Sequence, residues 1–218
     1  MRYAAICFDM DGTLVESENV WEKVEAEMLL ARGIVYTDEM RQQVIGLRLD
    51  EFFGRLKTML NLSESVPELI AELEERMLPA IPQSVQPKKG AQALIDYARS
   101  LGVPYCIASA SSMRIIDTVV EAMGWGELMT RRYSADLVAK GKPAPDVYLY
   151  AAQQMGVEPQ ACLAIEDSLN GTRSAVAAQM TTVVVPDFHT AHSAFDGLGA
   201  HIYRDLEQVL DALRTGAL

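Results

Sequence analysis

The sequence has too few cysteines and histidines to support several common classes of protein. It holds three cysteines, Cys7, Cys106 and Cys162, which lie far apart in the chain. An odd, unclustered set of cysteines predicts neither a disulfide framework nor a C-x-x-C metal clamp. No group of cysteines or carboxylates accompanies the histidines at the spacing of a zinc site. These histidines all fall late in the chain: His189, His192 and His201.

Positive charge and long apolar runs are also scarce. The 218 residues include 19 Lys and Arg against 30 Asp and Glu, a formal net charge of −11. Such a chain has no basic stripe that could neutralise the phosphates of a nucleic acid or bind an acidic membrane. No apolar run approaches the length of a membrane-spanning helix, and the chain enters a short strand-like run directly after Met1-Arg2. We therefore expect a soluble, cytoplasmic protein, with no nucleic acid and no membrane among its partners.

What the sequence does contain is a regular alternation of short β-like runs and helical patterns. Half of the residues are hydrophobic, which is enough for a sizeable core. The β-like runs cover residues 3–8, 104–108, 161–165 and 181–185. Strands separated by helices predict an α/β fold, in which a Rossmann-like, mostly parallel sheet carries helices on both faces. In such sheets ligands bind at the carboxyl ends of the strands.

Residues 17–82 interrupt this alternation with helical patterns only. Apolar residues recur at helical spacing in two sets: Val20, Trp21, Val24, Met28 and Leu29, then Leu69, Ile70, Leu73 and Met77. We therefore expect an all-helical cap domain at 17–82, inserted into a core domain made of 1–16 and 83–218. The chain should return to the core through Pro79, Pro82 and Pro87. The two junctions could act as hinges that let the insertion close over the strand ends.

The most informative motif follows the first β-like run. Asp9 and Asp11 stand two residues apart where the apolar strand must end, and Gly12 follows them. Alternate side chains of a strand point to the same side, so both carboxylates can face one small volume, while glycine allows a sharp turn. Paired acids of this kind can hold a cation, attack an electrophile or transfer a proton. A solvated Asp-Gly turn is the alternative reading of the same residues.

Two later segments place polar groups where they could bind an anion. Ser109 to Ser112 connect a β-like run to a helical pattern, and the start of a helix attracts anions. Lys142 stands between Gly141 and Pro143 at the entrance of another helix, where proline would restrict the backbone and direct the lysine. The alternative readings are an ordinary helix cap for the serines and a surface lysine in a proline-rich turn.

A further acidic pair ends the run at 161–165. Glu166 and Asp167 could cap the following helix, or they could complete a cation site that begins at Asp9. Carboxylate oxygens suit a hard ion such as Mg²⁺, whereas Ser109, Lys142 and backbone amides suit a phosphate group.

The ordered set of motifs resembles the haloacid dehalogenase-like superfamily over nearly the whole chain. The set is Asp9-x-Asp11-Gly12-Thr13, then Ser109, then Lys142-Pro143, then Glu166-Asp167. The place of the insertion, directly after the first motif, is similar to members that carry a helical cap.

The resemblance implies a role for each acid. Asp9 would be the nucleophile that forms an aspartyl-phosphate, and Asp11 would be the general acid and base. Mg²⁺ would be held by the carboxylate of Asp9, the main-chain carbonyl of Asp11 and the carboxylate of Asp167, with Glu166 adjoining. The implied cofactor is therefore Mg²⁺.

The resemblance also implies a phosphate-binding set made of Ser109 and Lys142, with Ala110 beside them. Dehalogenating members attack carbon and lack the second acid, so Asp11 favours phosphoryl chemistry. Members similar to β-phosphoglucomutase bind a second phosphate with an arginine and a Lys-Asn pair. Here Leu49 takes the arginine's place and Ser112-Met113 replace Lys-Asn, which favours hydrolysis over a phosphomutase.

Other segments are similar to the 2-deoxyglucose-6-phosphate and hexitol phosphatase group: Gly46-Leu47-Arg48, and Ser17-Glu18 with Trp21. Arg48 could reach substrate oxygens, or it could be an exposed cation at a helix edge. Glu18 could bind sugar hydroxyls, although we favour a role at the start of the first helix of the insertion.

The sequence thus predicts a monomeric, magnesium-dependent phosphatase that acts on a small sugar or polyol phosphate. The alternative is a sugar phosphomutase. A non-catalytic phosphosugar-binding module is a third reading, against which the complete set of acids argues, because binding alone needs no proton-transfer carboxylate beside a nucleophile. The loop at 187–199 could border the site, although no pattern assigns it a role.

Overall fold

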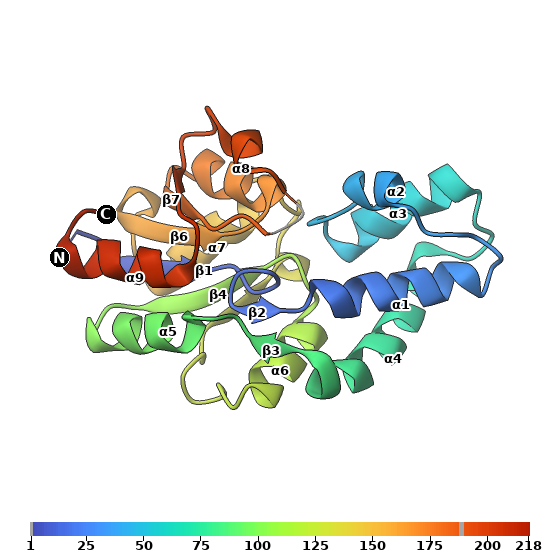
Figure 1. The fold of residues 1–218 in the computed structure, drawn as a ribbon, viewed down its shortest axis with the longest axis horizontal. Helices are drawn as coiled ribbons and strands as arrows, with labels where there is room; N and C mark the ends of the chain where they lie inside the picture. Colours follow the sequence, from blue (N-terminus) through green and yellow to red (C-terminus); the bar gives the residue numbers. More distant parts are fainter. Residues whose placement is uncertain (1, 188–189) are drawn as a thin grey trace.

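The computed structural model describes residues 2–187 and 190–218, and its centre is a six-stranded parallel sheet (Figure 1). The strand order is β5-β4-β1-β6-β7-β8, and each neighbouring pair runs parallel. The strands are β1 Ala5–Phe8, β4 Tyr105–Ser109, β5 Arg132–Ser134, β6 Cys162–Glu166, β7 Thr181–Val184 and β8 His201–Ile202. The predicted Rossmann-like α/β fold is confirmed, and β1 lies inside the sheet between β4 and β6.

The four predicted strands match β1, β4, β6 and β7 to within two residues. Strands β5 and β8 have no counterpart in the prediction. They are three and two residues long and form the two edges of the sheet. Such short edge strands carry too few alternating positions to be recognised from a sequence pattern.

The two faces of the sheet are packed by side chains of different size. In β1, Ile6 and Phe8 join a large hydrophobic cluster, whereas Ala5 and Cys7 join a small cluster on the other face. The large cluster includes helices α5 Ala91–Ser100, α6 Met113–Ala122 and α9 Leu206–Thr215. The small cluster includes α7 Asp146–Met155 and α8 Leu169–Ala177, and its strand residues are all alanine or cysteine. Small side chains on that face allow α7 to approach the sheet closely. Helices therefore cover both faces of the sheet, as predicted.

The three cysteines lie in β1, β4 and β6, and all are buried free thiols. They behave as small core residues, which agrees with the absence of a disulfide pattern in the sequence. None of the helices in the described part of the chain combines the length and the apolar character needed to cross a bilayer.

Four helices stand together at one end of the molecule, beyond the sheet (Figure 1). They are α1 Glu18–Leu30, α2 Asp38–Gln42, α3 Leu49–Leu60 and α4 Val66–Ser84, and we call residues 18–84 the four-helix segment. The predicted apolar positions of α1 and α4 are largely buried, and these two helices pack against each other. Helix α4 begins with a capping box in which Ser65 and Glu68 satisfy each other's backbone N–H groups.

The return of the chain to the sheet differs from the expectation in one respect. Pro79 and Pro82 lie inside α4, which continues to Ser84. Each proline removes one helical hydrogen bond. The helix nevertheless continues, because Met77 before the two prolines and Ile81 between them remain almost fully buried. The return itself is a two-stranded antiparallel ribbon of β2 Val15–Glu16 and β3 Gln86–Pro87.

Three short 3₁₀ helices complete the regular structure of the described residues: Ala135–Leu137, Pro159–Ala161 and His192–Phe195. The first of them follows β5 and faces the four-helix segment, to which it is tied by hydrogen bonds described below.

The packing of α4 can be tested at Leu73, which is fully buried. We expect Leu73→Ala to lower the free energy of unfolding by about 2–5 kcal/mol, because a cavity replaces buried methyl groups. Chemical denaturation followed by circular dichroism measures this change. Glu75→Ala, on the exposed side of the same helix, is the matched control and should change stability by less than about 0.5 kcal/mol. Equal effects of the two substitutions would contradict the packing.

Candidate active site

The site begins where β1 ends. Asp9 directly follows β1, and its backbone N–H donates to the carbonyl of Ile165 at 2.9 Å, so the residue is held by the sheet. Gly12 then turns the chain with φ of +76°, a conformation that favours glycine. A Cβ atom on Gly12 would lie 2.0 Å from Oδ2 of Asp167, so no side chain fits there. Lys88, which follows β3, donates from its ammonium group to the Gly12 carbonyl.

Lys142 links two of the predicted acids in the interior of the protein. Its Nζ atom lies 2.7 Å from Oδ1 of Asp9 and 2.6 Å from Oε1 of Glu166. It also donates to the carbonyl of Ala108 at 3.0 Å, and its side chain is 2 % exposed. Burial lowers the pKa of Lys142, but the two carboxylates outweigh this effect and raise the pKa above its ordinary value. The ammonium therefore stays charged.

Glu166 is the fully buried partner in this group. Besides Lys142, the hydroxyl of Tyr148 donates to its Oε1 atom at 2.6 Å. Tyr148 comes from α7, on the face of the sheet that is packed by small residues. Glu166 thus fixes the direction of Lys142 toward Asp9, a role that adjacency to Asp167 in the sequence does not reveal.

Three carboxylates meet at this point. Oxygen atoms of Asp9, Glu166 and Asp167 all lie within 4.8 Å of one another, and each residue is buried. Burial raises the pKa of Asp9 to about 8, with Lys142 opposing the rise and Glu166 adding to it. Burial and the negative charges of Asp9 and Glu166 likewise raise the pKa of Asp167 well above its usual range. When ionised, three acids around Lys142 would carry an excess of negative charge that a divalent cation would neutralise, and oxygen donors suit such an ion.

Asp11 is held apart from that cluster by three donors. Its Oδ1 atom accepts from the hydroxyl of Ser17 at 2.7 Å and from the indole N–H of Trp21 at 3.0 Å. Its Oδ2 atom accepts from the hydroxyl of Ser111 at 2.7 Å. Ser17 directly precedes the four-helix segment, Trp21 lies in its first helix, and Ser111 follows β4. In the sequence these three residues stand in or near the motifs, but no pattern there indicates that they orient Asp11.

The serine segment after β4 turns back on itself beside the acids. Ser109 is buried, and its hydroxyl accepts from the backbone N–H of Ser111 at 3.0 Å. Ser112 then precedes α6, so the site lies before a helix N-terminus, where anions are favoured. Ser109, Ala110 and Ser111 all line the cavity described next.

A cavity of about 230 Å³ connects the acids with the four-helix segment. Its size suits a small metabolite rather than a macromolecule. The core contributes the predicted site residues, namely Asp9, Asp11, Ser109, Ala110, Lys142 and Asp167. The four-helix segment contributes a further wall of polar and apolar residues that includes Glu18, Trp21, Glu25, Tyr36, Arg41, Ile45 and Leu49. Glu166 lies behind Lys142 and is not part of the wall.

Arg48 does not line this cavity. Its guanidinium donates to both carboxylate oxygens of Asp50 at 2.7 Å and to the carbonyls of Val138 at 2.9 Å and Ala135 at 3.2 Å. The structure thus places Arg48 as a tie between the four-helix segment and the loop after β5, in neither of the two positions weighed from the sequence. The motif Gly46-Leu47-Arg48 gives the position of the arginine in the chain, but it does not give the direction of its side chain.

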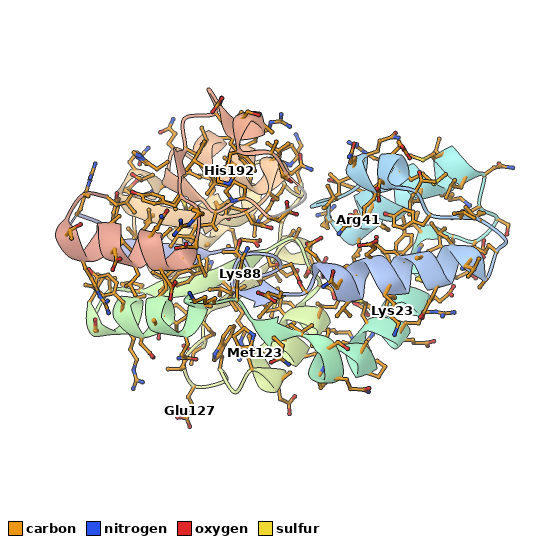
Figure 2. All side chains as sticks on the ribbon, in the orientation of Figure 1. Lys23, Arg41, Lys88, Met123, Glu127 and His192 are labelled. Carbon is orange, nitrogen blue, oxygen red and sulfur yellow. The ribbon has the colours of Figure 1, made fainter. Side chains whose placement is uncertain are left out.

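Glu18 lies in the first turn of α1 and also lines the cavity. Its carboxylate forms a salt bridge with Arg41 of α2, which the sequence reasoning missed (Figure 2 shows Arg41 inside the four-helix segment). Burial raises the pKa of Glu18, and Arg41 opposes that rise. Asp187 and Thr190, from the loop that the sequence placed at the possible border of the site, line the cavity. His189 falls outside the described residues.

Comparisons with known proteins agree with this geometry. The model of the haloacid dehalogenase-like hydrolase family matches residues 3–179. Hexitol phosphatase B of Escherichia coli (strain K12) is 28% identical over 184 residues, which are 84% of this chain and 83% of that protein. Fructose-1-phosphate phosphatase YqaB of the same strain is 31% identical over 189 residues, which are 84% of this chain and 97% of that protein.

A solved structure extends the likeness to three dimensions. The crystal structure of CbbY from Rhodobacter sphaeroides, in complex with phosphate, superposes with a TM-score of 0.85 at 26% identity. The match covers 95% of this chain and 96% of that chain. This chain therefore belongs to the haloacid dehalogenase-like hydrolase family, as its motifs predicted. The named relatives define it further as a phosphoric monoester hydrolase, a phosphatase.

The buried ion pairs around Lys142 generate a stability prediction. We expect Glu166→Gln to lower the free energy of unfolding by about 3–5 kcal/mol, because it removes the charge of one partner of the buried pair with Lys142 while an acceptor for Tyr148 remains. Urea denaturation of the protein measures the loss. Glu127→Gln, at the edge of the molecule (Figure 2), is the matched control and should be near neutral. A variant at 166 as stable as this control would show that Lys142 does not depend on Glu166.

Proposed function

We propose that this phosphatase hydrolyses a small sugar or polyol phosphate, that it depends on Mg²⁺, and that it forms an aspartyl-phosphate on Asp9. The observation that carries the proposal is the convergence of Asp9, Asp11 and Lys142 on one cavity, with Lys142 in direct contact with Asp9. The sugar phosphatases among the relatives support the choice of substrate class.

In the proposed mechanism Asp9 and Asp11 act in turn. An oxygen of Asp9 attacks phosphorus, the bond from phosphorus to the sugar oxygen breaks, and Asp11 gives its proton to that leaving oxygen. A water molecule then attacks the phosphorus of the aspartyl-phosphate and loses a proton to Asp11. The bond between phosphorus and Asp9 breaks, which releases inorganic phosphate and restores both acids. The donors on Asp11 from Ser17, Trp21 and Ser111 support this role, because they hold its carboxylate in one orientation.

The residues around the phosphate have distinct tasks. Lys142 and the hydroxyl of Ser109 are proposed to bind phosphoryl oxygens as charge shifts during the reaction. Mg²⁺ would be held by the carboxylates of Asp9 and Asp167 and by the main-chain carbonyl of Asp11, with Glu166 adjoining. It would offset the repulsion between Asp9 and the anionic phosphate. The crowded carboxylates of the structure support this assignment.

We propose further that residues 17–82 are a cap domain, that 1–16 and 83–218 form the catalytic core, and that the enzyme is a monomer. Helices from the four-helix segment form one wall of the cavity, which supports a cap that shields the reaction from water. The apolar side chains of Ile45 and Leu49 line that wall. They support hydrolysis over the alternative, a sugar phosphomutase, which must hold a second phosphate.

Substitution of the two acids tests the mechanism. We expect Asp9→Asn to lower phosphate release by at least about 10⁴-fold, because the nucleophile is lost. We expect Asp11→Ala to lower it by about 10²–10⁴-fold, because general acid and base catalysis is lost. Phosphate release from a panel of hexose, pentose and polyol phosphates measures both, and circular dichroism checks that the variants remain folded. Turnover by Asp9→Asn at the parent rate would rule out a nucleophile at Asp9.

Removal of the metal provides a separate test. After treatment with EDTA and removal of the chelator, we expect phosphate release to fall to background and to return on addition of Mg²⁺. Mg²⁺ should also raise the midpoint of thermal unfolding of the parent by a few degrees, since it binds the folded state. In Asp167→Asn this shift should disappear. Full activity of the chelated protein would contradict a metal-dependent mechanism.

A further inference from the structure

The four-helix segment is joined to the core in two different ways on its two sides. On one side α4, which ends next to β3, packs against α6 of the core (Figure 1). On the other side lie α2 and α3. Within the described residues, the hydrogen bonds between residues 37–60 and the core all involve Arg48, Glu51 or the carbonyl of Ile45. The segment is therefore packed at α4 and held by polar contacts at α3.

Arg48 makes most of these polar contacts. It directly precedes α3, and both carboxylate oxygens of Asp50 accept from its guanidinium at 2.7 Å, which fixes the direction of the side chain. The same guanidinium donates to the carbonyls of Val138 at 2.9 Å and Ala135 at 3.2 Å, and at 3.5 Å to that of Ala139. A charged donor forms stronger hydrogen bonds than a neutral one. Arg48 is thus oriented by its own segment and engages the core with a charged group.

The carbonyls that Arg48 contacts belong to the loop that leads to Lys142. At the end of this loop, the N–H of Gly141 donates to Oε1 of Glu51 at 3.4 Å. A Cβ atom on Gly141 would lie only 2.8 Å from the Cβ atom of Arg48. The loop and the start of α3 therefore meet at a distance that glycine at 141 permits and a larger residue does not.

Contacts of this kind differ from apolar packing in how readily they separate. Water competes for every hydrogen bond that a guanidinium makes with a carbonyl, so breaking such contacts changes the free energy far less than exposing a packed apolar face. The side of α3 can therefore separate from the core while α4 stays packed against α6. The cavity lies between these two parts of the protein, with Leu49 of α3 on one wall and Lys142 on the other.

We infer that Arg48 is a positioning residue, whose docking on the loop before Lys142 holds the four-helix segment against the core and closes the cavity around the substrate. When the guanidinium leaves the carbonyls, the segment opens at α3. The kinetic consequence rests on the proposed function, because it is measured on the phosphatase reaction, whereas the docking itself does not.

The inference separates the effects on KM and kcat. Arg48 does not line the cavity, so its loss changes how often the cavity is closed and leaves the reaction in the closed cavity unchanged. A protein that is only partly in its binding-competent state binds a ligand more weakly in proportion to that fraction. Saturating substrate restores the closed state, because the substrate binds that state better. KM should therefore rise while kcat is kept.

Arg48→Met tests this separation, because it removes the guanidinium and keeps an unbranched apolar side chain. We expect KM for the panel ester that the parent hydrolyses fastest to rise by about 5- to 20-fold and kcat to change less than about twofold. Arg55→Met is the matched control, since Arg55 lies on the same helix but donates to the carbonyl of Gln43 inside the segment. It should leave both values unchanged. An unchanged KM or a large loss of kcat in Arg48→Met would overturn the inference.

Gly141→Ala tests the close approach by a steric route. The φ of Gly141 lies outside the left-handed region, but a Cβ atom there would meet that of Arg48. We expect Gly141→Ala to raise KM as Arg48→Met does. Arg48→Gly lacks both the guanidinium and the Cβ atom, so adding Gly141→Ala to it should raise KM by less than a further factor of about two. Independent, multiplying effects would show that residue 141 does not act through the docking.

Tryptophan fluorescence reports the docking without turnover. The chain has two tryptophans, of which Trp21 lines the cavity and Trp125 is 1 % exposed. Quenching by acrylamide in the absence of substrate therefore reports mainly on Trp21. Arg48→Met should raise the quenching constant by at least about twofold, because the open state becomes populated, and Arg55→Met should not. Equal quenching of the parent and Arg48→Met would contradict an opening of the segment.

Failure of the proposed function would look different. If the parent releases phosphate from no ester of the panel, the phosphatase proposal fails, whatever the variants do. The quenching of Trp21 then still decides whether Arg48 holds the segment against the core.

Discussion

The buried ammonium of Lys142 is the interaction on which the arrangement of the site depends. It lies between the carboxylates of Asp9 and Glu166, which come from two adjacent strands, β1 and β6, and it also contacts the end of β4. Removing charges from water is expensive, and such a group is stable only when its partners are well placed. The contacts of Lys142 therefore hold three strand ends in register around one point. They also leave Asp9 facing a cavity with its neighbours already oriented.

The sheet makes this buried charge group possible through the different sizes of its two packed faces. Bulky residues such as Ile6 and Phe8 support α5, α6 and α9, whereas alanine and cysteine on the other face admit α7 at close range. Helix α7 brings Tyr148 to Glu166, and the loop before α7 brings Lys142. The small residues that look unremarkable in the sequence thus create the space in which the site is assembled. Function and packing depend here on the same strands.

The four-helix segment completes the site by two kinds of contact. Ser17, directly before the segment, and Trp21, in its first helix, hold Asp11, while Arg48 ties the segment to carbonyls of the loop after β5. The same segment supplies Glu25 and Tyr36 to the cavity wall.

The sequence by itself determined the order of strands and helices, the inserted helical segment and the acids, serine and lysine of the site, because these depend on local periodicity and on motifs at strand ends. It placed neither the short edge strands β5 and β8 nor the continuation of α4 through Pro79 and Pro82, where packing outweighed local preference. Only the tertiary structure decided that Glu166 orients Lys142, that Arg48 turns away from the cavity and that Arg41 faces it. The direction of a side chain depends on partners that are distant in the chain, and no local pattern records them.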